Sequence, residues 1–412
     1  MNLTLDYTNK KIIDTKIIIT GSKSESNRLL ILQQWYSNLE VQNLSNSDDT
    51  QHIQEALQSK KETINIGHAG TAMRFLTAYF STQEEREIIV TGSHRMQNRP
   101  IQVLVNALQD LGAVISYLDK EGYPPIRIKG KKLTIPKVAI NGNVSSQYIS
   151  ALLLIAPVLE HGLEIELRIE VTSRPYLEMT LNLLEQLGIQ TSWQGNTIRV
   201  LPKSFIEDTQ ITVESDWSSA SYFYSLVALD EIGAKLILSS YKKDSLQGDS
   251  ILAEIYTDFG VETEFINDTI IITKKFQIPK HKIQNLKLET RNLKNAPDLA
   301  QTIVVTAFGL GLPCNLTGLH TLKIKETDRL VALQNELQKL GATLTITENS
   351  LSLKASSSIN ANIHIETYQD HRMAMAFAPL AIKTPITIRN AEVVSKSFPD
   401  FWKDLKGCFF KN

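Results

Sequence analysis

Two kinds of helix alternate along the chain according to its pattern of hydrophobic and polar positions. The first kind is apolar or small at almost every position after its first turn, which predicts helices that are buried on all sides. Six segments have this pattern: GSKSESNRLLILQQW, AGTAMRFLTAYF, SSQYISALLLIAPV, SSASYFYSLVAL, PDLAQTIVVTAFGLG and DHRMAMAFAPLAI. The second kind is amphipathic, as in DDTQHIQEALQSK, and short β-rich runs such as ATLTI follow several of its members.

A leucine or phenylalanine followed by glycine ends the amphipathic segments in a recurring way. The glycines are Gly112, Gly188, Gly260 and Gly341, with a shorter match at Gly407. We expect each of them to be a left-handed residue just after a helix. Together the two helix families predict six repeated units of two helices with short strands between them, grouped as two domains of three units.

Composition places the chain among ordinary globular proteins. Its 412 residues suggest two or three domains, and a net charge of −1 argues against nonspecific binding to nucleic acid or to an anionic membrane. Cys314 and Cys408 form neither a disulfide framework nor a zinc-binding spacing. The first residues lack the apolar core of a signal peptide, and the longest apolar stretch is too short to span a bilayer. We expect a cytoplasmic protein.

The segment GSKSESNR, from Gly21 to Arg28, carries cations where a helix should begin. Its serines suit an N-cap, but the positive end of the helix dipole repels Lys23 and Arg28. A bound phosphate or carboxylate would explain those cations. The segment is not a nucleotide P-loop, because a serine stands where that motif needs its second glycine. Capping and anion binding both remain open for this stretch.

Other predicted helices begin in a similar way. Polar residues open the buried helices at 70–74, 145–147, 216–219, 298 and 370–372, and the amphipathic ones at Arg99, Arg174, Gln247 and Arg329. If rotation relates the repeats, these helix starts occupy equivalent places and point toward one region. That region would be strongly positive and would suit a small, highly anionic ligand. Capping alone is the competing interpretation.

The ordered motifs GSKSESNR, HAGTAMR, RMQNRP, VSSQY, SRPY, SDWSSAS, LQGD, NAPDLAQ, KIKETDR, YQDHRMAM and SKSFPDF resemble the 5-enolpyruvylshikimate-3-phosphate synthase family. The resemblance runs from about Gly21 to Phe401. It implies an α/β fold of two domains, each built from three βαβαββ repeats, with the active site in a cleft between them that closes on substrates. The first domain would comprise residues 1–19 and 215–412, and the second residues 20–214. No cofactor is implied, and we expect a monomer.

The resemblance implies transfer of the enolpyruvyl group of phosphoenolpyruvate to the 5-hydroxyl of shikimate 3-phosphate, with release of phosphate. Together these substrates bring up to about six negative charges. By resemblance, phosphoenolpyruvate would contact Lys23, Gly70, Arg99, Gln147, Arg329, Arg372 and Lys396. Shikimate 3-phosphate would contact Lys23, Ser24, Arg28, Ser145, Ser146, Gln147, Arg174, Tyr176, Asp298 and Lys325.

Three residues are implied in catalysis. Asp298 would take the proton of the 5-hydroxyl, Glu326 would protonate the methylene carbon, and Lys23 is a further candidate. The alternatives are an N-cap for Asp298, which follows Pro297, and an ion pair for Glu326. A structural role is favoured for His371, and the eight histidines show no metal-binding motif.

Three positions depart from the family pattern. His68 stands where asparagine is usual, Thr321 also replaces an asparagine, and Phe75 replaces a proline. The first two bring into question how tightly the substrates, or the phosphoenolpyruvate-competitive inhibitor glyphosate, would bind.

Three other functions are the alternatives. The related enolpyruvyl transferase that acts on UDP-N-acetylglucosamine typically uses a loop cysteine, and neither Cys314 nor Cys408 is placed for that role. A catalytically silent homologue would have lost Lys23, Asp298 or Glu326, and all are retained. A nicotinamide dehydrogenase is disfavoured because no GxGxxG motif follows a strand.

Overall fold

The computed structural model describes residues 1–143, 145–169, 171, 174–277 and 290–410. The chain divides into two units, one formed by Met1–Thr20 with Glu214–Asn412 and the other by Gly21–Val213. Thr20 and Glu214 thus group with the first unit, whereas the ranges expected from the sequence place them in the second domain. The Glu214 carboxylate accepts hydrogen bonds from Trp217 Nε1 at 2.8 Å and from the Lys242 amide at 2.9 Å, which tie it to the first unit.

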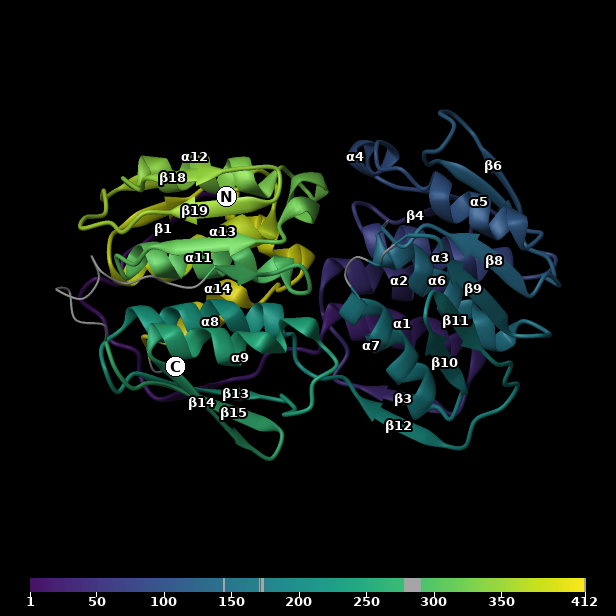
Figure 1. The fold of residues 1–412 in the computed structure, drawn as a ribbon, viewed down its shortest axis with the longest axis horizontal. Coiled ribbons are helices and arrows are strands. Elements are labelled where there is room, and N and C mark those ends of the chain that lie inside the picture. The colour runs from purple at the N-terminus through teal and green to yellow at the C-terminus, as the bar shows by residue number, and fades with distance from the viewer. Residues whose placement is uncertain (144, 170, 172–173, 278–289, 411–412) are drawn as a thin grey trace. The chain divides into compact units, whose positions relative to one another are not determined.

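The second unit contains repeated strands and helices in sequence order (Figure 1). Its helices are α1 (Lys23–Trp35), α2 (Asp48–Gln58), α3 (Gly70–Ser81), α4 (His94–Gln97), α5 (Gln102–Asp110), α6 (Ser146–Ile155), the 3₁₀ helix η1 (Ala156–Val158) and α7 (Arg174–Gln186). Its strands are β3 (Leu39–Gln42), β4 (Thr63–Asn65), β5 (Glu87–Thr91), β6 (Val114–Tyr117), β7 (Ile126–Lys129), β8 (Lys137–Ile140), β9 (Leu163–Leu167), β10 (Thr191–Gln194), β11 (Thr197–Val200) and β12 (Thr209–Thr212).

The first unit is built from both ends of the chain. Its helices are α8 (Trp217–Leu229), η2 (Gly248–Ile251), α9 (Leu252–Ile255), η3 (Tyr256–Phe259), η4 (Pro297–Leu299), α11 (Ala300–Gly309), η5 (His320–Ile324), α12 (Arg329–Lys339), α13 (His371–Phe377), η6 (Ala378–Ile382), η7 (Ala391–Lys396) and α14 (Phe401–Gly407). Its strands are β1 (Leu3–Leu5), β2 (Thr15–Ile17), β13 (Lys235–Ser239), β14 (Val261–Ile266), β15 (Thr269–Lys274), β16 (Arg291–Asn292), β17 (Cys314–Thr317), β18 (Leu344–Ile346), β19 (Ser350–Leu353), β20 (Ile363–Ile365) and β21 (Ile386–Ile388).

Six sheets in the described residues correspond to the six predicted units. Four of them repeat one topology, a parallel pair extended by two antiparallel strands, with the orders β4-β5-β7-β6, β8-β9-β11-β10, β2-β13-β15-β14 and β16-β17-β19-β18. The other two sheets are reduced. In one, β3 pairs in parallel with β12, and in the other β21 pairs with β20 and with β1, matching Leu3 to Ile388. The predicted α/β repeat fold is confirmed, and three of its sheets pair strands that are distant in sequence: β1 with β21, β2 with β13, and β3 with β12.

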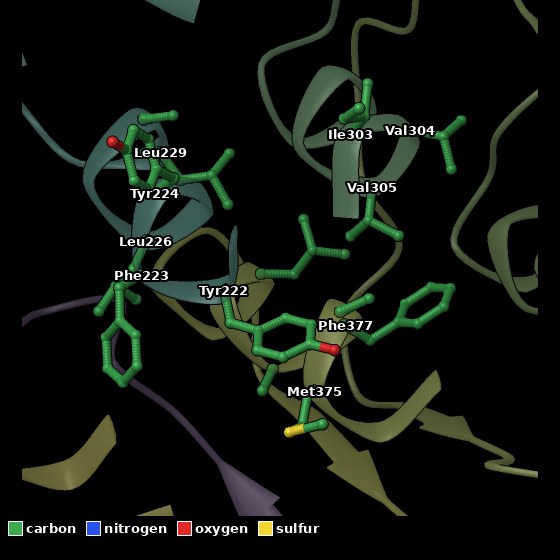
Figure 2. Close-up of a cluster of buried hydrophobic side chains, with 14 of the residues drawn as sticks. Tyr222, Phe223, Tyr224, Leu226, Leu229, Ile303, Val304, Val305, Met375 and Phe377 are labelled. Atoms are coloured by element: carbon green, nitrogen blue, oxygen red, sulfur yellow. The ribbon is translucent and has the colours of Figure 1, made fainter. Parts of the chain in front are cut away.

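The six helices predicted to be buried form the cores of the units. In the first unit α8, α11 and α13 pack together, and Figure 2 shows their side chains meeting, including Tyr222, Ile303 and Phe377. Each of these three side chains is at most 2% exposed. In the second unit α1, α3 and α6 contact one another in the same way. All the residues of α3 are buried, Arg74 included, as its mostly apolar and small residues predict.

Four of the five recurring glycines have the predicted left-handed backbone. Their φ angles are 99° at Gly112, 69° at Gly188, 80° at Gly260 and 97° at Gly341. The prediction is wrong for Gly407, which is the last residue of α14 and has no positive φ. The backbone continues in helical geometry into Cys408, so this glycine does not reverse the chain.

Candidate functional site

In the second unit, α1 begins without a side-chain cap. Ser22 is its N-cap residue, yet its hydroxyl accepts no hydrogen bond from the first turn, so capping does not explain the serines of this segment. Lys23 is the first helical residue, and its Nζ lies 3.3 Å from Oδ2 of the buried Asp49 at the start of α2. The Asp49 Oδ1 atom is buried and accepts no hydrogen bond within the described residues. Asp49 therefore offers a carboxylate that orients Lys23, a partner that the sequence analysis missed.

Two guanidinium groups converge at the start of α3. A Cβ atom added to Gly70 would lie 2.5 Å from Nη1 of Arg99 and 2.9 Å from Nη1 of Arg74. Burial, reinforced by the positive charge of Arg99, lowers the pKa of Arg74 to about 10. Within the described residues neither arginine forms an ion pair with a carboxylate, and the buried Nε of Arg74 has no hydrogen-bond partner. Such a pair of cations at a helix N-terminus is suited to bind an anion. Arg74 was not among the predicted site residues.

The starts of α6 and α7 lie beside those of α1 and α3. Gln147 donates from Nε2 to Thr71 Oγ1 at 3.1 Å, which joins the first turns of α6 and α3. Ser145 caps α6 by accepting from the Gln147 amide at 3.4 Å, and Ser146 follows it. Contacts within the second unit thus bring several of the predicted helix starts together.

Arg28 is buried, and within the described residues its hydrogen bonds go to neutral oxygens. Its Nε donates to Thr180 Oγ1 at 2.7 Å, and Nη2 donates to Ser150 Oγ and to the Tyr176 carbonyl, both at 3.1 Å. Its Nη1 donates to the Ser24 carbonyl at 2.7 Å, and burial lowers its pKa to about 10. Arg28 therefore joins α1 to α6 and α7 and adds a positive charge that forms no direct ion pair with a carboxylate in the described part of the chain.

Arg174 begins α7 in a more exposed setting. It pairs with Glu178 at 2.7 Å, and its guanidinium lies 4.2 Å from the ring centroid of Trp193. Part of the predicted SRPY motif, Ser173, lies outside the described residues.

In the first unit, three carboxylates surround Arg329. The guanidinium donates from Nε to Asp370 at 2.6 Å, from Nη1 to Asp298 at 2.8 Å and from Nη2 to Glu326 at 2.9 Å. Arg329 is 1% exposed, and it is the first residue of α12. Because each oxygen accepts a charge-assisted bond, this fork fixes the geometry of all three carboxylates. Asp370 was not among the predicted site residues, although it lies in the DHRMA motif.

Further cations complete this cluster. Arg372 Nη2 lies 3.1 Å from Asp298 Oδ2, and Lys325 Nζ lies 3.5 Å from Asp298 Oδ1. Lys396, which is 7% exposed, contacts Glu326 through its Nζ. Asp298 lies inside η4, whose N-cap residue is Ala296, and Leu299 is the N-cap residue of α11, so Asp298 is not the N-cap considered above. Glu326 does form the ion pairs that its alternative interpretation described.

The electrostatics of the cluster keep both catalytic candidates ionised. Burial alone would raise the pKa of Asp298, but the charges of Arg372, Lys325 and Arg329 outweigh it and hold that pKa well below its usual range. Burial is likewise outweighed at Glu326, where Lys396 and Arg329 hold the pKa well below its usual range. Both side chains are therefore carboxylates at neutral pH and can accept a proton.

A third carboxyl group of this region, that of Asp249, has its pKa raised instead of lowered. Burial, reinforced by the negative charge of Asp298, raises the pKa of Asp249 to about 7. Asp249 accepts a hydrogen bond from Ser218, whose oxygen lies 3.2 Å from Arg372 Nη2. These residues come from η2, α8 and α13, so the helix starts of the first unit also lie close together. Asp249 lies in the LQGD motif and Ser218 in the SDWSSAS motif, although neither was among the predicted site residues.

The residues that depart from the family pattern lie in different settings. The side chain of His68 is 44% exposed, with Nε2 4.0 Å from Asp48 Oδ2. The buried Oγ1 of Thr321 has no hydrogen-bond partner in the described part of the chain. The ring of Phe75 lies beneath Arg28, 5.5 Å from its guanidinium carbon. His371 is 2% exposed, with Nδ1 3.8 Å from Asp370 Oδ1.

Other kinds of site find no support in the described residues. No group of three His, Cys, Asp or Glu side chains there is arranged to hold a metal ion, and no helix there is long and apolar enough to cross a membrane. Cys314 and Cys408 are buried, and burial raises the pKa of the Cys314 thiol to about 12. Neither cysteine resembles a reactive loop cysteine.

Comparisons with known proteins all point to one family. A family model described as EPSP synthase (3-phosphoshikimate 1-carboxyvinyltransferase) matches residues 54–405. A 3-phosphoshikimate 1-carboxyvinyltransferase of Bacteroides fragilis is 46% identical over 403 residues, covering 97% of this chain and 96% of its own. One from Haemophilus influenzae is 35% identical over 435 residues, covering 97% and 98%. A solved EPSP synthase structure from Acinetobacter baumannii superposes with a TM-score of 0.78 at 22% identity, covering 99% of this chain and 98% of its own.

Proposed function

Because the chain belongs to the EPSP synthase (3-phosphoshikimate 1-carboxyvinyltransferase) family, we infer that it transfers the enolpyruvyl group of phosphoenolpyruvate to the 5-hydroxyl of shikimate 3-phosphate and releases phosphate. It is thus an alkyl-group transferase of the shikimate pathway, which leads to chorismate and the aromatic amino acids. The observation that supports the site assignment is a contrast between the two units. The candidate site residues of the second unit include several cationic side chains and few carboxylates, whereas those of the first unit include carboxylates that are each paired with cationic side chains.

The cations of the second unit bind the anionic groups of the substrates. Lys23, Arg99 and Gln147 contact phosphoenolpyruvate at the start of α3, where Gly70 lets the backbone approach. In the described residues the buried Arg74 and the half-buried Arg99 form no ion pair with a carboxylate, which supports this role, since a bound anion would compensate their charge. Shikimate 3-phosphate is held through Ser24, Arg28, Ser145, Ser146, Arg174 and Tyr176.

The first unit supplies proton transfer. Asp298 takes the proton of the 5-hydroxyl as that oxygen attacks C2 of phosphoenolpyruvate, and its low pKa leaves it ionised for this step. Glu326 delivers a proton to C3, which becomes a methyl group in the tetrahedral adduct. Loss of a C3 proton and of phosphate then forms the enol ether. Arg329, Arg372, Lys396 and Lys325 stabilise the negative charge of the substrates and the departing phosphate.

The ionised state of Glu326 has a direct consequence for this scheme. A carboxylate cannot donate a proton until it has gained one, and in the ligand-free protein Lys396 and Arg329 disfavour the protonated form. Bound phosphoenolpyruvate competes for both cations and brings its own negative charge close to Glu326. Both effects raise the carboxyl pKa. Proton uptake by Glu326 therefore accompanies substrate binding.

Residues of both units act on one pair of substrates in this proposal, so the complete site assembles when a cleft closes on them. Small-angle scattering checks this point, because an envelope that does not change when both ligands are added contradicts closure. We further propose that the enzyme works as a cytoplasmic monomer. Size-exclusion chromatography with light scattering and cell fractionation test these two properties.

Phosphate release by the purified protein tests the function. Phosphoenolpyruvate is supplied with shikimate 3-phosphate or with UDP-N-acetylglucosamine, and Lys23→Ala is compared with Lys137→Ala, which changes a lysine whose side chain is 58% exposed on β8. We expect release with shikimate 3-phosphate alone, lost in Lys23→Ala and kept in Lys137→Ala. Release with neither acceptor indicates a catalytically silent homologue, and His68 and Thr321 are then the first positions to revert to asparagine.

A further inference from the structure

A strained turn precedes the segment that carries Asp370 and Arg372. The Asp370 amide donates to the Thr367 carbonyl at 2.8 Å, and the two residues between them, Tyr368 and Gln369, have φ angles of 53° and 55°. Positive φ at both central positions defines a type I′ turn, which favours asparagine and glycine. No other consecutive non-glycine residues in the described part of the chain have positive φ. Tyrosine and glutamine in this backbone need an external constraint.

Glu336 supplies that constraint from α12. Its side chain is 0% exposed, and Oε1 accepts a hydrogen bond from the Tyr368 hydroxyl at 2.6 Å. The other oxygen, Oε2, accepts from the Glu366 amide at 3.0 Å and from Lys339 Nζ at 2.6 Å. One buried carboxylate thus holds the chain both before the turn and within it. Because its partners include a charged ammonium, Glu336 is compensated and well ordered.

The same helix also holds the far side of the turn. Arg329 begins α12 and binds Asp370 at 2.6 Å, and Glu336 lies seven residues later, about two helical turns along the same face. Asp370 in turn caps α13 by accepting from the Arg372 amide at 2.9 Å, and Arg372 reaches Asp298 at 3.1 Å. The position of the turn therefore sets where Asp370 and Arg372 lie relative to the catalytic carboxylate.

We propose that Glu336 and Tyr368 are positioning residues for the reaction: their hydrogen bond keeps the 367–370 turn in its left-handed form and thereby places Asp370 and Arg372 for phosphoenolpyruvate. Neither residue is among those assigned above to contact the substrates. The kinetic part of this proposal rests on the proposed function, whereas its structural part does not.

The kinetic test removes the anchor with the smallest change. Tyr368→Phe and Glu336→Gln should each raise KM for phosphoenolpyruvate about ten-fold, the equilibrium factor of one charge-assisted hydrogen bond, and leave KM for shikimate 3-phosphate within about two-fold. The matched control is Tyr117→Phe in the second unit, which removes a buried hydroxyl that has no hydrogen-bond partner in the described residues. Equal changes in both KM values, or none, overturn the proposal.

A rescue separates positioning from general stability. Tyr368→Asn combined with Gln369→Gly installs the residue pair that a type I′ turn prefers, so the turn forms without its anchor. This double variant should restore KM for phosphoenolpyruvate to within about two-fold of the wild type, and adding Glu336→Gln to it should have no further effect on that KM. Gln369→Gly alone serves as a control and should behave as wild type. Failure of the double variant to recover contradicts the role assigned to the turn.

NMR spectroscopy tests the structural part of the proposal independently of enzymatic activity. The ring C2 proton of His371, identified by its loss in His371→Gln, reports on the residue that follows the turn and Asp370. This resonance should shift in Tyr368→Phe and return toward its original position in the Asn-Gly double variant. If the wild type shows no phosphate release, the proposed function fails while this measurement still decides the structural claim. An unchanged His371 resonance in Tyr368→Phe refutes the claim.

Discussion

Arg329→Lys is the substitution that most directly tests the caged arrangement of the first unit. The guanidinium binds three different carboxylates, whereas one ammonium lacks the planar fork needed to hold all of them. Arg372 and Lys325 still face Asp298, and Lys396 still faces Glu326, so the largest loss falls on Asp370, which receives two of the arginine's bonds. We expect a destabilisation of about 3 kcal/mol, the lower end of the range for breaking a buried ion pair.

Urea unfolding followed by tryptophan fluorescence measures this change, since Trp217 is fully buried in the same unit. The matched control is Arg389→Lys, where an arginine with a 44% exposed side chain lies 3.2 Å from Glu366. An exposed pair of this kind contributes at most about 1 kcal/mol. The reasoning is refuted if Arg329→Lys unfolds within about 0.5 kcal/mol of the wild type, because the three carboxylates would then not depend on the guanidinium.

Three further predictions concern single residues. Asp249 has a pKa raised to about 7, so its protonated form in the folded state contributes stability that is lost as pH rises from about 4 through 7. Asp249→Asn should therefore gain stability relative to the wild type between pH 5 and pH 8, and the prediction is contradicted if the urea midpoints of the two proteins change equally between these pH values. Gly70→Ala places a methyl group 2.5 Å from Arg99 Nη1 and 2.9 Å from Arg74 Nη1, so the ends of both side chains have to shift. Stability should stay within about 1 kcal/mol while KM for phosphoenolpyruvate rises about ten-fold or more, and an unchanged KM would remove this glycine from the site. Gly407→Ala should stabilise the protein by about 0.5–1 kcal/mol, because the backbone at Gly407 is helical and its surroundings are open, whereas Gly341→Ala, at φ 97°, should destabilise it by about 1 kcal/mol. Thermal unfolding that shows Gly341→Ala to be the more stable of the two variants would contradict this prediction.

Local sequence pattern predicts the elements of this fold well, because a helix that is buried on all sides has apolar or small residues at nearly every position. The segment 70–81, which is apolar or small at nearly every position apart from Arg74, is predicted to be a core helix, and it is one. Four left-handed glycines were predictable as well, because each follows an amphipathic helical segment that ends there. Gly407 was misjudged because the same dipeptide pattern occurs there inside the last turn of a helix.

Pairings between distant segments could not be predicted in this way. Strand β1 completes a sheet with β21, and β2 completes one with β13, but no local periodicity records which distant strand supplies the missing edge. The same limit applies to side chains. Asp49 looks like an ordinary first-turn residue of α2, and its role as the partner of Lys23 emerges only when α1 and α2 pack together.

The ionisation of the carboxylates was also beyond the sequence. Resemblance indicated Asp298 and Glu326 as candidates, but their pKa values depend on which cations the fold brings within hydrogen-bond distance. Asp249, a residue of the same type in the same unit, has its pKa moved in the opposite direction because burial dominates there. Motifs therefore indicated the candidate residues, and the three-dimensional contacts determine the direction in which their pKa values shift.

The most direct test of the proposed addition and elimination is the reaction of the wild-type protein in deuterated water, with the product identified by proton and carbon NMR. Protonation of C3 followed by loss of a C3 proton must leave deuterium in the methylene group of the enol ether formed at the 5-hydroxyl of shikimate 3-phosphate. The account predicts that product, with deuterium in its methylene group and one phosphate released for each molecule formed. Formation of the enol ether without deuterium, or release of phosphate with pyruvate as the only organic product, would contradict it.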